Sequence, residues 1–141
     1  MDRSTIGASI LKIDGVLLLI VALIHFAATP YALHFVSSQS TPEAFAQIGP
    51  PFLLSFIIVG ILLLPIGLST VYCANSFQRG ERWARVICGF NAFGVLLLPV
   101  ALMLTMPARY FGAVLFLVAA ILVWIVAISM TVPIVLKKST Y

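Results

Sequence analysis

The sequence contains very few charged residues. Only 9% of the 141 residues are charged, whereas 62% are hydrophobic. Ordinary soluble domains have roughly 25% charged and about 45–50% apolar residues. A soluble domain with so few polar side chains would have to expose large apolar areas to water. The composition therefore excludes an ordinary soluble domain and predicts a polytopic membrane protein whose surroundings are the lipid bilayer.

Residue types that form catalytic or metal sites are equally scarce. The two histidines, His25 and His34, are nine residues apart on neighbouring segments, which does not suit a bis-histidine haem. No Cys-x-x-Cys, zinc spacing or Gly-rich phosphate loop is present. The acidic residues fall in separate segments, so no carboxylate pair shares a site; they are Asp2, Asp14, Glu43 and Glu81. We therefore expect no catalytic residues, no metal and no cofactor, and an enzyme is disfavoured.

The basic residues do not point to nucleic acid. The net charge is +4, but the eight Lys and Arg residues are spread over short segments between apolar runs. Binding to a nucleic acid backbone requires a continuous basic face that neutralises several phosphates. We expect no nucleic-acid partner, and we interpret the positive charge as a signal of membrane topology.

Four apolar runs dominate the chain, at about residues 10–28, 52–72, 87–105 and 111–136. A bilayer core of about 30 Å requires roughly 20 apolar residues per helix. The sequence thus predicts an all-α fold, a single domain over residues 1–141 that forms an integral membrane four-helix bundle. Because the second and third connections are short, the last three helices should be antiparallel neighbours in an up-down arrangement.

The longest connection runs from Thr29 to Pro51. Thr41, Pro42 and Glu43 are typical of a helix start, with Thr as N-cap and Pro in the first turn. A Gly-Pro-Pro sequence at residues 49–51 is expected to stop this helix after one or two turns. We therefore expect a short interfacial helix in the first loop, lying on the membrane surface.

Basic residues set the predicted orientation. After four crossings, seven of the eight lie on one face, and only Arg109 lies on the other. Lys and Arg near the ends of membrane helices mark the cytoplasmic side. Both termini should therefore be cytoplasmic. Cys73 and Cys88 lie near this face, where a reducing compartment disfavours a disulfide, so we expect two small buried side chains. The topology-setting residues are Arg79, Arg82, Arg85, Lys137 and Lys138, together with Arg3 and Lys12.

Polar side chains inside a bilayer are costly, so they are candidates for function. Asp14 and His25 are eleven residues apart, which places them within roughly 20° of one helix face and about 16 Å apart along the axis. One interpretation is a polar stripe that faces a pathway or a partner. The other, which we favour because both residues are near an interface, pairs Asp14 with Lys12, Arg85 or a helix end, and pairs His25 with a loop carbonyl.

Two further polar residues lie deeper in the apolar runs. Asn91 is expected to join helices through hydrogen bonds, as amides at this depth commonly do. Trp124 lies near mid-membrane, away from the interface that tryptophan prefers. Its indole N–H requires an acceptor, either Asn91 or a carbonyl freed by proline. For both residues, packing is favoured over ligand binding.

The favoured function is a structural or accessory subunit that packs against partner membrane proteins or against copies of itself. The first alternative is a small oligomeric transporter or channel with Asp14 and His25 on its pathway. The second is a binding protein or enzyme for a quinone or lipid that enters near Pro65, Asn91 and Trp124. These alternatives differ in the direction that the Asp14 and His25 side chains face, which a sequence does not determine.

Overall fold

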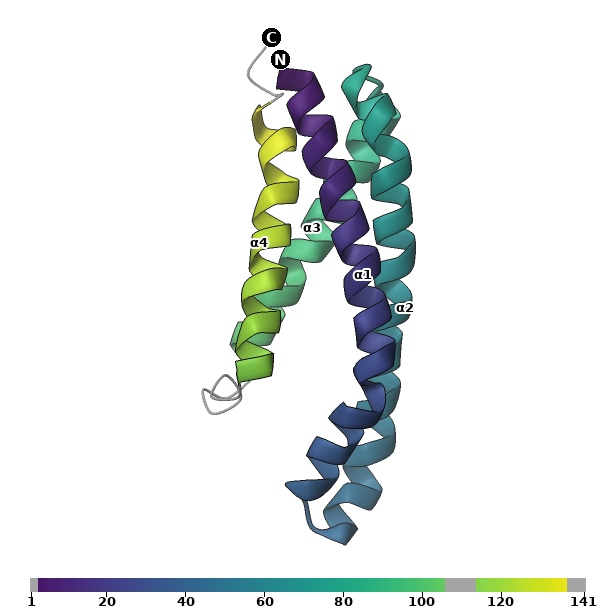
Figure 1. The fold of residues 1–141 in the computed structure, drawn as a ribbon, viewed down its shortest axis with the longest axis vertical. Helices are drawn as coiled ribbons and strands as arrows, with labels where there is room; N and C mark the ends of the chain where they lie inside the picture. The colour runs from purple at the N-terminus through teal and green to yellow at the C-terminus, as the bar shows by residue number, and fades with distance from the viewer. Residues whose placement is uncertain (1–2, 106–113, 137–141) are drawn as a thin grey trace.

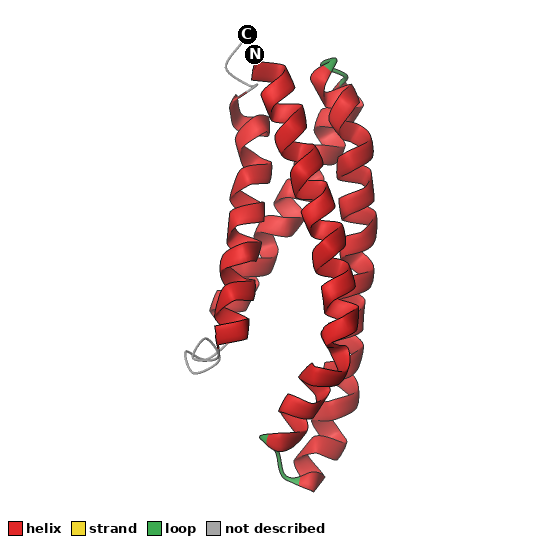
Figure 2. Cartoon of the chain, viewed as in Figure 1, coloured by secondary structure: helices red, strands yellow, loops and turns green. Residues whose placement is uncertain are grey.

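The described part of the chain is helical apart from two short turns. The computed structural model describes residues 3–105 and 114–136, and within these ranges it contains no strand (Figure 2). The helices are α1 (Arg3–Ser38), α2 (Pro42–Gln78), α3 (Arg82–Thr105) and α4 (Val114–Leu136). The all-α prediction is confirmed, and the number of helices agrees with the number of apolar runs.

The helices are arranged as two adjacent pairs (Figure 1). α1 and α2 lie side by side along their whole length, α3 contacts α2, and α4 contacts both α1 and α3. The start of α1, the end of α4 and the turn between α2 and α3 lie at the same end of the molecule. From that end the α3–α4 pair diverges from the α1–α2 pair (Figure 1).

The predicted short interfacial helix is wrong. α1 was expected to end near residue 28 but continues through Pro30 to Ser38. The helix that begins at Pro42 does not stop at residues 49–51; it runs without a break into the second apolar run and ends at Gln78. The predicted loop is therefore the closed end of one long helical hairpin, turned by residues 39–41.

The helix start predicted at Thr41 is confirmed, whereas the helix stop predicted at residues 49–51 is wrong. The Thr41 hydroxyl accepts a hydrogen bond from the Ala44 backbone N–H, as an N-cap does. Pro50 and Pro51 have a φ that suits a helix, but they deprive the carbonyls of Ala46 and Gln47 of their helical donors. Both of those residues are exposed, so solvent is able to satisfy the freed carbonyls.

The α1–α2 hairpin extends beyond the other two helices. Asn91 of α3 is level with Ser69 of α2, to which it is hydrogen-bonded. α3 continues only 14 residues further, to Thr105, which corresponds to Ser55 on α2. α2 extends another 13 residues, to Pro42, so its end lies about 20 Å beyond the end of α3. Figure 1 shows the same excess length at the closed end of the hairpin.

Large apolar side chains cover the outside of the helices. Three segments are long and apolar enough to cross a membrane, namely Ser4–Ser38, Pro42–Gln78 and Arg82–Leu104. Only 28%, 17% and 22% of their most apolar windows are buried, so most of this apolar surface faces outward. The described apolar helix within α4 is shorter, Ala120–Val135. An apolar exterior of this extent supports the prediction of a small membrane protein with transmembrane helices.

The helices share two buried clusters in the part of the molecule where all four meet. One contains Phe77 of α2 and both cysteines, which are buried and free, as expected of two small side chains. The other joins all four helices and consists of Leu18, Ala22, Leu63, Ala92, Val95, Val126, Ala127 and Met130. On α1 and α2 these clusters reach no further toward the closed end than Ala22 and Leu63.

Backbone contact between two glycines holds α1 close to α2. A Cβ placed on Gly15 would lie 2.9 Å from the carbonyl oxygen of Gly67, and a Cβ on Gly67 would lie 2.9 Å from the carbonyl oxygen of Gly15. Only glycine permits this reciprocal approach. This contact fixes the rotation of α1, and with it the direction in which Asp14, the residue immediately before Gly15, is presented.

Candidate functional site

Asp14 is buried between helices rather than paired with a basic residue. Its side chain is only 3% exposed, and its Oδ1 accepts a hydrogen bond from the Ser129 hydroxyl of α4 over 2.6 Å. The other oxygen, Oδ2, is buried and has no hydrogen-bond partner. The expected pairing with Lys12, Arg85 or a helix end is therefore wrong. Asp14 joins α1 to α4 and retains one unused acceptor.

His25 faces a different neighbour. Its imidazole stacks on the ring of Phe56 in α2, with centroids 3.9 Å apart and planes 15° from parallel. The ring of Phe52 stacks in turn on Phe56 at 5.9 Å. The Asp14 and His25 side chains therefore contact different helices, α4 and α2, although their spacing gives them similar directions on α1. The α3–α4 pair diverges from the α1–α2 pair (Figure 1). Asp14 contacts α4 through Ser129, whereas the ring contact of His25 is with α2.

Asn91 joins α3 to α2 through a compact set of hydrogen bonds. Its amide nitrogen donates to the hydroxyls of Ser69 and Thr70 at 2.8 and 2.9 Å, and more weakly to the carbonyl of Ile66 at 3.4 Å. The same carbonyl accepts from the Thr70 hydroxyl at 2.7 Å. Thr70 is fully buried and has no access to water. The cluster therefore supplies the hydrogen bonds that these buried polar groups require between two apolar helices. The arrangement is that of an interhelical contact.

Trp124 is half-buried on α4. The Asn91 amide nitrogen donates to α2, which leaves only the amide oxygen as a possible acceptor for the indole N–H. Among the hydrogen bonds of the described residues, none involves the Trp124 indole. The structure therefore does not bring Asn91 and Trp124 together as one site.

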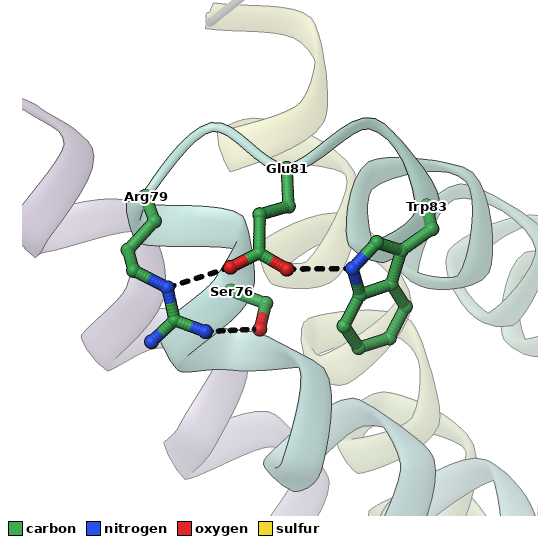
Figure 3. A network of polar contacts seen from close by, with 4 residues as sticks. All are labelled: Ser76, Arg79, Glu81 and Trp83. Atoms are coloured by element: carbon green, nitrogen blue, oxygen red, sulfur yellow. Dashed lines mark hydrogen bonds and ion pairs between the residues drawn. The ribbon is translucent and has the colours of Figure 1, made fainter.

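The turn between α2 and α3 is organised by the carboxylate of Glu81 (Figure 3). Oε1 accepts from Arg79 Nε at 2.6 Å, and Oε2 accepts from the indole N–H of Trp83 at 2.6 Å. Arg79 also donates to the Ser76 hydroxyl at 2.7 Å. The hydrogen bond from Arg79, more than any other contact, holds the pKa of Glu81 below its ordinary value. One acid thus connects the end of α2 to the first turn of α3.

The three arginines of this turn have different environments. Arg79 belongs to the Glu81 network, and Arg82 is exposed. Arg85 donates through Nη2 to the carbonyl of Gly80 at 2.7 Å. Gly80 has a φ of +83°, a conformation that glycine adopts without strain, and this allows the tight turn. Lys137 and Lys138, the other residues expected to set topology, lie outside the described residues.

No family model, curated protein or solved structure matches this chain. Its function is therefore inferred from the fold and the contacts described above.

Sequence reasoning did not single out two aromatic residues at the turn. Trp83 follows Glu81 by two residues, and the centroid of its ring lies 6.4 Å from that of Tyr72, with the two ring planes at 43° to each other. The Tyr72 side chain is 76% exposed and the Trp83 side chain 44%. Exposed Tyr and Trp at the end of an apolar run are typical of the membrane–water interface. The position of both rings beside the charged turn was the available signal.

A shallow groove lies on the outer face of α3, next to this turn. It has a volume of about 320 Å³ and is lined by Arg85, Val86, Gly89, Phe90 and Phe93. Elsewhere in the described residues, no group of three or more His, Cys, Asp or Glu side chains is placed to hold a metal ion. Asp14 and Asn91 join helices through hydrogen bonds, whereas the α3 groove combines a cation with an apolar surface.

Proposed function

We propose that the protein is a structural or accessory subunit of the membrane, which packs against a partner membrane protein or against a second copy of itself. In this proposal the four helices cross the bilayer as an up-down bundle with both termini in the cytoplasm. The Arg79–Arg85 turn then lies on the cytoplasmic face, and the closed end of the α1–α2 hairpin projects from the opposite face.

The observation that carries the proposal is the extension of α1 and α2 beyond α3 and α4. This end of the hairpin is not covered by the other two helices (Figure 1). At this end Tyr31 is 56% exposed and Ile48 is 47% exposed. Glu43 is the one charged residue between His34 and Pro51. A hairpin end that carries a single charge and reaches past the bilayer with apolar side chains exposed is suited to burial against another protein.

The polar contacts of the core support the same proposal. Asp14 binds Ser129, Asn91 binds the hydroxyls of α2, and His25 stacks on Phe56. These contacts assemble the bundle and hold the hairpin in a fixed direction. A rigid scaffold that presents one uncovered end is what an accessory subunit requires.

The test is site-specific photocrosslinking in the native membrane, with native mass spectrometry of the extracted complex. A photoreactive residue at Ile48 or Tyr31 should capture one partner chain, or a second copy, in a stoichiometric complex. The matched control is Ile125 of α4, which is 56% exposed but lies away from the hairpin end. Ile48→Asp should remove the complex while the four helices remain folded. Capture that is equal at Ile125, or a complex unaffected by Ile48→Asp, would contradict the proposal.

A second candidate function is favoured by Asp14 Oδ2, the buried oxygen without a partner. A carboxylate with one free acceptor inside a membrane bundle is able to bind a proton or a small cation during transport. Under this proposal the protein is a small transporter or channel. In proteoliposomes, Asp14→Asn should abolish cation or proton flux, because it retains an acceptor for Ser129 but loses the charge. Flux that is absent from the wild type, or equal in the variant, would exclude this candidate.

A further inference from the structure

The outer face of α3 has an open glycine, Gly89, beside two exposed phenylalanines. A Cβ on Gly89 would meet nothing within 4 Å, so its position forms the floor of the groove described above. Phe90 is 73% exposed and Phe93 60% exposed, and both line the groove. From Arg85 to Phe93 the groove follows eight residues of helix, or about 12 Å. It is a shallow and largely open apolar groove along one helix.

The end of the groove nearest the turn is basic. Arg85 lines it, and Arg82 lies one helical turn earlier with its side chain exposed. The Glu81 carboxylate is occupied by Arg79 and Trp83, and within the described ranges no carboxylate forms an ion pair with Arg82 or Arg85. Arg85 Nε is also buried without a hydrogen-bond partner. The positive charges of Arg82, which is exposed, and of Arg85, which lines the groove, are therefore not neutralised by a carboxylate of the described residues.

The exposed aromatic pair places the basic end at the depth of lipid headgroups. Tyr72 and Trp83 flank the turn, and such rings settle where hydrocarbon meets headgroups. Arg85 is two residues further into α3 than Trp83. The groove then begins at the headgroups and runs along α3 into the hydrocarbon.

We propose that this groove binds an anionic phospholipid. The phosphate contacts Arg82 and Arg85, and one acyl chain lies over Gly89 beside Phe90 and Phe93. Basic residues at the membrane surface attract anionic lipids, which are concentrated in the cytoplasmic leaflet. The inference goes beyond the proposed function, because it concerns the face of α3 and not the hairpin end.

A second copy of the chain fits this groove less well than a lipid. Close helix pairs use small residues four positions apart, but the residue four positions after Gly89 is the large Phe93. The other open glycine of α3, Gly94, lies five residues away and therefore about 140° around the helix. A symmetric pairing of parallel α3 helices would also place the arginines of one copy against those of the other, which is unfavourable.

Native mass spectrometry of the full-length protein in detergent tests the site. The probes are phosphatidylglycerol and phosphatidylcholine with the same acyl chains, titrated separately. Wild type should retain one phosphatidylglycerol about tenfold more tightly than phosphatidylcholine, which corresponds to about 1.4 kcal/mol. Gly89→Leu fills the groove without meeting other atoms and should remove this preference. The matched control Gly94→Leu, also at an open position, should retain it.

Arg82→Gln measures the electrostatic part without disturbing Arg85, which holds the Gly80 carbonyl. One basic residue at a membrane surface contributes about 1 kcal/mol, so phosphatidylglycerol binding should weaken about fivefold. Equal retention of the two lipids by the wild type would overturn the proposal. So would a Gly89→Leu variant that binds phosphatidylglycerol as the wild type does, or a wild-type dimer that Gly89→Leu converts to monomer.

Discussion

Ser129 donates a hydrogen bond to Asp14 over 2.6 Å, across 115 residues of sequence, and so joins the first helix to the last. The contact is the only described hydrogen bond between the side chains of α1 and α4. It lies one residue from the Gly15–Gly67 contact that fixes α1 against α2. Asp14 is therefore located where three helices converge, and this position explains why a carboxyl group is retained within an apolar bundle.

Replacing Ser129 should destabilise the bundle. Ser129→Ala leaves both oxygens of Asp14 buried without a side-chain donor, and we expect the free energy of unfolding to fall by about 1 kcal/mol. The measurement is equilibrium unfolding in mixed detergent micelles. Thr131→Val is the control, because the Thr131 hydroxyl bonds only to Ile128 of its own helix. Equal losses in the two variants would show that the contact between helices does not contribute.

The Asn91 cluster should contribute more than a single hydrogen bond. Asn91→Leu removes the donor shared by Ser69 and Thr70, and we expect a loss of about 1–2 kcal/mol. Thr70→Val should cost less, and the double variant should cost less than the sum of the two, because the residues share one interaction. The same unfolding assay measures all three variants. Strict additivity would contradict direct coupling between these side chains.

Replacement by alanine should change stability in opposite directions at a glycine in a helix contact and at a glycine on an open surface. Gly67→Ala places a methyl group 2.9 Å from a backbone oxygen of α1, which should separate the helices and cost about 1–3 kcal/mol. Gly94→Ala meets nothing and should be neutral, or should stabilise α3 by up to about 1 kcal/mol through helix propensity. Thermal unfolding followed by circular dichroism distinguishes them. A stable Gly67→Ala variant would mean that the α1–α2 contact tolerates wider spacing.

Acid should loosen the turn between α2 and α3. The pKa of Glu81 is lowered in the folded protein, chiefly by the hydrogen bond from Arg79. Its stabilising contribution is therefore complete above the pKa of the unfolded chain and is lost as the pH falls through the lower, folded pKa. Trp83 fluorescence, recorded in a Trp124→Phe background, should change in this acidic range. Glu81→Gln should remove the change, and a transition that persists in this variant would assign it to another group.

The sequence predicted where turns and polar residues lie along the chain better than it predicted which residues those polar side chains contact. The Thr41 N-cap and the basic turn between the second and third helices could both be located from residue order, because a cap or a turn involves neighbours in sequence. The partner of Asp14 could not, because Ser129 is one of several hydroxyls on distant helices. The aromatic contact of Trp83 with Tyr72 across the turn was missed for the same reason.

The prolines show most clearly which structural features follow from neighbouring residues and which depend on distant parts of the chain. Proline removes one backbone hydrogen bond, but its φ is compatible with a helix, so whether a helix ends there depends on what satisfies the freed carbonyl. The described helices continue through Pro30, Pro50, Pro51, Pro65, Pro99 and Pro133. Sequence alone predicted a stop at Pro50 and Pro51, whereas the long hairpin includes both residues.

The amino-acid sequence by itself determined that the chain is helical, how many apolar helices it forms and where the charged turn lies. Each of these depends on the residues within one segment: the length of an apolar run predicts a helix, and a cluster of charged residues predicts a turn. Only the tertiary structure decided that α1 and α2 form one extended hairpin, that Asp14 and His25 contact different helices, and that Gly89 opens a groove beside Arg85. Each of these depends on which surfaces are covered by distant parts of the chain, and that coverage is set by packing between helices.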